Sequence, residues 1–173
     1  CMTCDEILEA IMNKLDELAE LGAEIDALLA KYDMFSGIVE QFKADLATAE
    51  AERARMDNGD YVTNETTGET ETAHEQSARR AYRNDTYTQW KAKKISSEEK
   101  IRRDRHSYEL SEAEIDQWAA RAKKDKDKEI KDLKDNIQDV QDTIDELIDA
   151  LLEAVDEMEM CDKKLAELLA ALE

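Results

Sequence analysis

The sequence predicts an all-α protein, a long antiparallel coiled-coil hairpin with a small, mainly helical insertion at its tip. Near each end of the chain, apolar residues recur at alternating steps of three and four. This is the spacing of a helix that buries one narrow stripe against another helix. Between the two stripes lies a segment of different composition, bounded by a turn signal and a new helix start. We therefore expect a first arm at residues 1–57, a tip at 58–110 and a second arm at 111–173.

The composition is that of an elongated helical protein rather than a globular enzyme. Of 173 residues, none is proline, four are glycine and 39% are charged, which fits helices with few turns and much surface. The net charge of −20 disfavours contact with nucleic acids or anionic membranes and favours basic partners. No apolar run approaches the roughly 20 residues of a membrane span. No secretion signal is visible near the N-terminus, so the localisation stays open.

The first arm is expected to begin near Thr3, because Thr3 and Glu6 have the spacing of a capping box. Its predicted stripe contains Leu8, Ile11, Leu15, Leu18, Gly22, Ile25, Leu29, Tyr32, Phe35, Val39, Phe42, Leu46, Ala49, Arg53 and Met56. The step from Tyr32 to Phe35 joins two equivalent heptad positions, so a local change of register is expected there. The arm ends at the Asp-Asn-Gly-Asp turn signal of residues 57–60.

The tip begins with a stretch rich in threonine and glutamate around Gly68, which is compatible with a loop or a short β-hairpin. A helix with a weak apolar stripe is expected over residues 71–95. Ser96 and Glu99 form a second capping-box signature, which predicts a short helix that ends near His106.

The second arm is expected to start at Ser111, which forms a third capping-box signature with Glu114, and to run to about Ala171. The charged run at residues 123–129 interrupts its apolar stripe. The stripe then continues without a break through Ile130, Leu133, Ile137, Val140, Ile144, Leu147, Leu151, Ala154, Met158, Cys161, Leu165, Leu168 and Leu172.

An antiparallel pairing with Cys4 near Cys161 brings the turn at residues 57–60 level with the helix start at Ser111. The two changes of register then also lie opposite each other. This agreement favours an intramolecular hairpin over a parallel multimer. It leaves three readings of the cysteines: a Cys4–Cys161 disulfide, a Cys1–Cys161 disulfide, or small buried thiols in a reducing environment.

The sequence offers little catalytic or metal-binding chemistry. Its two histidines, His74 and His106, lack the second ligands that a zinc protease or a di-iron bundle needs. Cys1 and Cys4 have the C-x-x-C form, but no second pair completes a zinc site. We therefore expect no enzymatic activity, no metal and no cofactor.

The tip carries a basic segment on an acidic chain. Residues 79–105 contain ten basic and four acidic residues, with aromatic side chains among them. In one reading the aromatic residues form the core of the tip and the basic ones offset the acidic arms. In the other, the tip binds a partner through Arg79, Arg80, Tyr82, Arg83, Tyr87, Trp90, Lys93, Lys94, Arg102 and Arg103. A protein partner fits so acidic a chain better than a nucleic acid does.

Apolar residues that the hairpin alone leaves without a partner predict association with a further helix. These are Ile38, Val39, Phe42, Leu165, Leu168, Leu169 and Leu172, and the stripe of the second arm is widened by Ile148, Leu152 and Val155. The sequence thus predicts a non-enzymatic structural or interaction protein. It would associate with copies of itself or with a helical partner, and present its tip to a protein. The alternative is an acidic inhibitor or mimic that binds a basic, nucleic-acid-binding surface of another protein.

Overall fold

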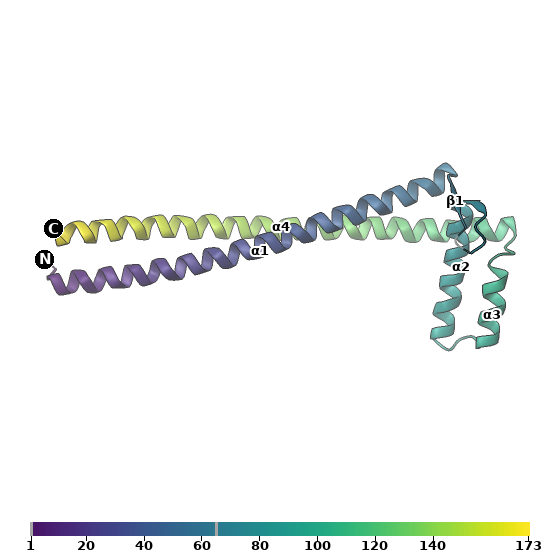
Figure 1. Ribbon diagram of the computed structural model, residues 1–173, viewed down its shortest axis with the longest axis horizontal. Coiled ribbons are helices and arrows are strands. Elements are labelled where there is room, and N and C mark those ends of the chain that lie inside the picture. The colour runs from purple at the N-terminus through teal and green to yellow at the C-terminus, as the bar shows by residue number, and fades with distance from the viewer. Residues whose placement is uncertain (1, 65) are drawn as a thin grey trace. The chain divides into compact units, whose positions relative to one another are not determined.

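The computed structural model describes residues 2–64 and 66–173 (Figure 1). Within them the chain forms four helices and one two-stranded sheet, which are α1 (Cys4–Asn58), β1 (Tyr61–Thr63), β2 (Thr70–Thr72), α2 (Ala73–Lys91), α3 (Ser97–His106) and α4 (Glu112–Leu172). The predicted all-α class is confirmed. Over the same described residues, no helix combines the length and apolar character needed to cross a membrane.

The chain divides into two compact units, and each contains part of both long helices. Unit 1 comprises Cys1–Phe42 and Asn136–Glu173, and unit 2 comprises Lys43–Asp135. Unit 1 has 22 acidic and 4 basic residues, a net charge of −18, whereas unit 2 has 22 acidic and 20 basic residues, a net charge of −2. Nearly all of the net negative charge therefore belongs to unit 1, because the acidic residues of unit 2 are matched by basic ones.

Both long helices begin where their capping boxes predict. The backbone N–H of Glu6 donates to Thr3 Oγ1 at 3.3 Å, and the N–H of Thr3 donates back to Glu6 Oε2 at 3.2 Å. Ser111 and Glu114 form the same reciprocal pair at 3.2 and 3.3 Å. Each pair satisfies N–H groups that the first helical turn leaves without a partner.

The tip starts with a β-hairpin, the second of the two conformations that its sequence allows. Strands β1 and β2 are antiparallel, with Val62 opposite Glu71. Helix α2 begins at Ala73, two residues later than expected, because Thr72 is its N-cap and accepts the Glu75 N–H at 3.1 Å. The extended backbone of Thr72 thus ends β2 and starts α2.

Helix α2 is shorter than expected because the chain turns just after Lys91. Lys93 has a φ of 58°, which lies outside the right-handed helical region. Ser96 then caps α3, as predicted, by accepting the Glu99 N–H at 3.1 Å. Helices α2 and α3 lie side by side within unit 2 (Figure 1).

The core of unit 2 is small and combines alanines with one aromatic cluster. Ala78 on α2 and Ala119 on α4 have no exposed surface. The Tyr82 ring meets the edge of Trp118 at a centroid distance of 5.3 Å, and that of His106 at 5.9 Å. Small residues allow close approach of the helices, while Tyr82 fills the space between α2, α3 and α4.

In unit 1, the start of α1 lies beside the end of α4, and the two helices run in opposite directions (Figure 1). The buried cluster consists of Ile7, Ile11 and Leu168, with Ala10 and Leu165 packed against it. Further along, the Cys161 thiol lies 3.6 Å from the Lys14 carbonyl oxygen. A Cβ added at Gly22 would lie 3.8 Å from Met158 Cε.

The predicted alignment of the two arms is wrong by about two heptads. Cys161 was expected near Cys4, but it contacts Lys14. In unit 2, Arg53 Nε donates to Asp127 Oδ1 at 2.8 Å, a similar displacement from the expected partner. A shift by whole heptads puts apolar positions opposite apolar positions again, so the stripe alone does not distinguish the two alignments.

The buried side of α1 uses a different column of apolar residues from the predicted one. Ile7 is 8% exposed, whereas its neighbour Leu8 is 48% exposed. The contrast recurs at two later pairs, where half-buried Lys14 precedes exposed Leu15 and half-buried Leu28 precedes exposed Leu29, whereas Leu21 and Gly22 are both half-buried. Counted from Ile7, steps of three and four continue through Tyr32 and Phe35 without interruption. The expected change of register at this point is therefore wrong.

The stripe predicted for α4 is the least exposed side of that helix. Every stripe position from Ile130 to Leu168 is buried or half-buried, and the three most buried are Ala154, Cys161 and Leu168. Leu172, the last predicted position, is 39% exposed.

Candidate interaction surfaces

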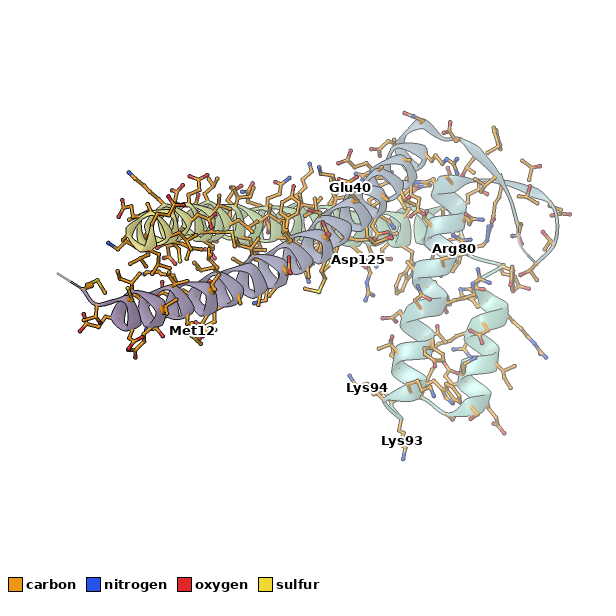
Figure 2. The ribbon with its side chains drawn as sticks, turned by 60° about the vertical axis from the view of Figure 1, so that its left-hand side comes forward. Met12, Glu40, Arg80, Lys93, Lys94 and Asp125 are labelled. Carbon is orange, nitrogen blue, oxygen red and sulfur yellow. The ribbon has the colours of Figure 1, made fainter. Side chains whose placement is uncertain are left out.

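Unit 1 exposes large apolar side chains on both of its helices. Those that share one side of the helix pair are Leu8, Met12, Leu15 and Leu29 on α1, and Ile148, Leu152, Val155 and Leu169 on α4. Met12 is 66% exposed and Leu152 is 60% exposed, the largest fractions in each set. We call these eight residues the apolar face of unit 1; Figure 2 labels Met12.

Helical spacing puts the two sets on one side of the helix pair. Leu8 follows the buried Ile7 by one residue, a rotation of about 100° in the chain direction. Ile148 follows the half-buried Leu147 by one residue, the same rotation. Because the two helices run in opposite directions, equal rotations along each chain turn both sets toward the same side.

The other side of unit 1 is polar. Lys14 and Glu17 form an ion pair there at 2.9 Å, and they line a hollow together with Glu157, Lys164 and Cys161. Met160, at 73% exposed, also lines this hollow. Unit 1 thus has one apolar side and one charged side.

The prediction that seven apolar residues lack a partner within the chain is wrong for three of them. Val39 is 4% exposed, and Leu165 and Leu168 belong to the cluster around Ile7. Ile38 and Phe42 are half-buried, while Leu169 and Leu172 are exposed. The two-heptad shift explains the difference, because it brings the end of α4 beside the start of α1 and leaves no overhang.

The structure does not contain the predicted Cys4–Cys161 disulfide. Both thiols are free, with Cys4 exposed and Cys161 buried. Lys14, the neighbour of Cys161, lies about 15 Å of helix away from Cys4, beyond the span of a disulfide. The alternative bridge to Cys1 lies outside the described residues. Burial, together with the nearby Glu17 carboxylate, raises the pKa of the Cys161 thiol and disfavours its reactive thiolate.

Several arginines predicted to bind a partner instead bond within the tip. Arg79 Nη1 donates to Glu71 Oε2 at 2.6 Å, and both side chains are largely buried. Arg83 Nη1 donates to the Tyr108 hydroxyl at 3.0 Å and lies 5.5 Å from the centre of that ring. These contacts hold α2 against β2 and against the segment after α3.

Arg102 and Arg103 bind one carboxylate on their own helix. Their Nε atoms donate to Glu99 at 2.8 and 2.9 Å, and Arg103 also donates to Gln89 Oε1 at 2.9 Å. The hydrogen bonds from Arg102 and Arg103 lower the pKa of Glu99 to about 2.

Four more residues of the predicted tip site lie at or near the turn between α2 and α3, of which Tyr87, Lys93 and Lys94 are exposed and Trp90 is half-buried. Tyr87 and Trp90 pack with ring centroids 5.9 Å apart, and Lys91 Nζ lies over both rings at 5.7 and 5.5 Å. Lys93 and Lys94 are exposed at the turn itself (Figure 2). We call these five residues the tip cluster. Tyr82 therefore belongs to the core of the tip, as the first reading predicted, while partner binding by the tip cluster stays a prediction.

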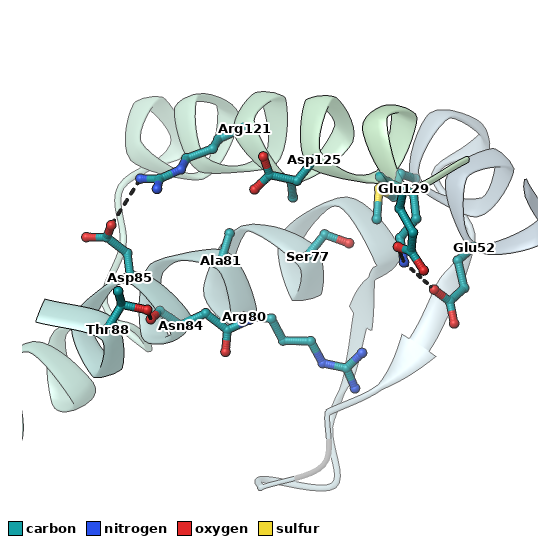
Figure 3. A pocket seen from close by; sticks show the side chains of 13 residues that line it. Glu52, Ser77, Arg80, Ala81, Asn84, Asp85, Thr88, Arg121, Asp125 and Glu129 are labelled. Carbon is teal, nitrogen blue, oxygen red and sulfur yellow. Dashed lines mark hydrogen bonds and ion pairs between the residues drawn. The ribbon is translucent and has the colours of Figure 1, made fainter. Parts of the chain in front are cut away.

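A hollow of about 430 Å³ lies in unit 2 between α2, α4 and the end of α1 (Figure 3). Arg80, one of the predicted tip residues, lines it. Arg121 Nη1 donates to Asp85 at 3.2 Å, and Lys126 Nζ donates to Glu52 at 2.8 Å. Because these charges are used to join helices, the hollow does not by itself indicate a charged ligand.

No known protein family, curated protein or solved structure matches the chain. Evidence for function therefore comes from the surfaces described above. Sequence analysis assigned Leu8, Leu15 and Leu29 to the buried stripe and so missed the α1 half of the apolar face. The adjacent pairs Ile7-Leu8 and Leu28-Leu29 were the available signal, because they make the stripe wider than one partner helix covers.

Proposed function

We propose that this chain is a non-enzymatic interaction protein, a coiled-coil helical hairpin that binds a further helix through the apolar face of unit 1. One observation supports this best: eight large apolar side chains are exposed along one side of a helix pair. Soluble monomers rarely leave extended apolar patches uncovered, because burying apolar surface gains about 25 cal/mol per Å².

In this proposal, α1 and α4 form the two arms of an antiparallel coiled coil. The buried positions of both helices recur at steps of three and four, which is the coiled-coil repeat. The contacts of Leu168 with Ile11 and of Cys161 with Lys14 fit an antiparallel arrangement in unit 1. The Arg53–Asp127 bond fits the same arrangement in unit 2.

The tip, residues 58–110, is then the part that the arms present to a protein partner. The tip cluster is its best candidate surface, because it combines exposed lysines with aromatic rings. Replacing Lys93 and Lys94 by glutamate should weaken such binding, and an unchanged affinity would exclude the cluster.

Site-specific photo-cross-linking tests the role of the apolar face in cells that make the protein. A photoreactive residue at position 152 should form adducts with another chain, either a second copy or a different protein. The same residue at position 160 is the matched control, because Met160 is at least as exposed but lies on the polar side of the same helix. Equal adduct yields at the two positions would contradict the proposal.

The second candidate function is an acidic inhibitor or mimic that occupies a basic, nucleic-acid-binding surface. The net charge of −18 on unit 1 favours it. Binding of that kind should weaken steeply with added salt and should tolerate Leu152→Asn. Binding through the apolar face should instead be lost in the Leu152→Asn variant.

A further inference from the structure

We propose that the partner of the apolar face is a basic amphipathic helix, a segment with one apolar side flanked by lysine and arginine. This inference rests on the proposed function and adds the chemistry of the partner. Its basis is the combination of exposed apolar side chains and acidic charge on one side of unit 1.

The charged residues that interrupt the apolar face are acidic. On α1, Asp26 lies two heptads after Met12 and therefore on the same column. On α4, Glu159 lies one heptad after Leu152, and Asp162 lies one heptad after Val155. All three acidic residues are exposed. A helix seated among these leucines would place its flanking residues near carboxylates, which favours lysine and arginine there.

The basic residues of unit 1 do not offset this charge on the apolar face. There are four of them, and three, Lys14, Lys163 and Lys164, line the polar hollow around Cys161. The fourth, Lys31, lies two heptads after Glu17 and therefore on the same polar side of α1. The acidic field on the apolar face is therefore left for a partner to neutralise.

The same charges argue against a second copy of this chain as the occupant. Two copies of unit 1, each with a net charge of −18, would repel each other. Asp26, Glu159 and Asp162 would then face other carboxylates, and like charges across an interface cost several kcal/mol. A basic helix buries the same leucines and converts this repulsion into attraction.

The dimensions of the face fit one helix of about 20 residues, since Leu8 to Leu29 spans about 32 Å of α1. Its middle section contains small residues on α1, the exposed Ala19 and the half-buried Gly22, beside which Met158 packs. Small side chains at this point leave a shallow depression between the exposed leucines, which allows a partner helix to approach closely.

The test uses the full-length chain and a fluorescein-labelled synthetic peptide of about 20 residues, with leucine on one helical side and lysine elsewhere. Fluorescence anisotropy should show saturable binding. Leu152→Asn and, separately, Leu15→Asn should weaken it about tenfold, as expected for one lost leucine contact. Met160→Asn, on the polar side of α4, should leave the affinity within about twofold. Circular dichroism of each variant verifies that the helices are retained.

Three outcomes would overturn the inference. The first is equally strong binding of a peptide with the same composition in scrambled order, which would show charge attraction alone. The second is equal affinity of the Leu152→Asn and Met160→Asn variants for the peptide. The third is light scattering that shows a dimer of the chain, lost in Leu152→Asn, together with no peptide binding. In that last case the proposed function stands and only the basic partner is excluded. If Leu152→Asn changes neither mass nor peptide binding, both proposals fail.

Discussion

A comparison of Leu168→Ala with Leu169→Ala tests the packing of unit 1 most directly. The two positions are adjacent on α4, and the substitution removes the same three carbons at each. Leu168 is 7% exposed and packs against Ile7 and Ile11, whereas Leu169 is 49% exposed on the apolar face. The two variants therefore differ in burial and in little else.

The expected losses follow from the exposed fractions. Burial of one methylene is worth about 0.8 kcal/mol, so three carbons contribute about 2 kcal/mol at Leu168 and about 1 kcal/mol at Leu169. Leu168→Ala also leaves a cavity between the helices, which adds to its cost. We expect Leu168→Ala to lower the stability of unit 1 by about 2–3 kcal/mol and Leu169→Ala by about 1 kcal/mol or less.

Hydrogen exchange of the backbone amides measures this difference locally. The amides of α1 near Ile11 should exchange faster in Leu168→Ala and change little in Leu169→Ala. Amides around Tyr82 in unit 2 serve as an internal reference, because neither substitution contacts them. Equal losses at the two positions, or a larger loss in Leu169→Ala, would refute the assignment of Leu168 to the buried side.

Four further predictions address the cysteines, the core of unit 2 and the charges. Under a thiol reagent, Cys4 should react rapidly and Cys161 slowly, because Cys161 is buried and its thiol pKa is raised. Ala119→Leu should destabilise unit 2 by about 1–3 kcal/mol by overpacking, while the exposed Ala120→Leu changes stability little in the same thermal melt. The pKa of Glu99 is lowered from 4.5 to about 2, so its ion pairs should stabilise unit 2 above pH 4.5 and lose that effect as the pH falls toward 2, a dependence that Glu99→Gln should remove. Raising the salt concentration should stabilise unit 1 by screening its acidic residues, as read from α1 amide exchange.

The parts of the fold that could be predicted are those encoded by neighbouring residues. A capping box depends on two residues three positions apart, and Thr3 with Glu6 and Ser111 with Glu114 were recognisable for this reason. The same holds for the turn after α1, where Gly59 adopts a φ of 68°. Each of these signals involves only residues within about three positions of one another, so it does not depend on the partner helix.

The alignment of the helices could not be predicted in this way, because it depends on residues that are far apart in the sequence. A heptad stripe repeats every seven residues, so every shift by whole heptads pairs apolar with apolar positions. The predicted alignment chooses among these shifts by placing the turn at residues 57–60 level with Ser111. In the structure the end of α1 is not level with the start of α4, because Arg53 bonds to Asp127, well after the first residue of α4 at Glu112.

The apolar face was obscured by the same redundancy. Where two adjacent residues are both leucine or isoleucine, as at Ile7-Leu8, either column satisfies the three-four spacing. The predicted stripe took Leu8 and required a change of register at Tyr32 to continue. The column through Ile7 requires none, so the fewest interruptions over the whole helix would have been the better criterion.

What selects the alignment differs between the two units. In unit 2, Arg53 bonds to Asp57 on its own helix and to Asp127 on α4, and Lys126 on α4 pairs with Glu52 on α1. Complementary charges on the two facing helices therefore stabilise one alignment over the others. Unit 1 has only four basic residues and cannot use this device to the same extent.

Size must take the place of charge in unit 1. The long side chain of Met158 packs beside Gly22, which has no side chain. The small thiol of Cys161 contacts the carbonyl oxygen of Lys14, whose side chain is long. Size matching of this kind is weaker than a network of paired charges and leaves the carboxylates of unit 1 largely uncompensated. In our proposal, a basic helix that binds to the uncovered apolar side of this acidic helix pair would stabilise it. The charge distribution that leaves the alignment of unit 1 less strongly specified would then also be the feature that suits unit 1 to bind a partner.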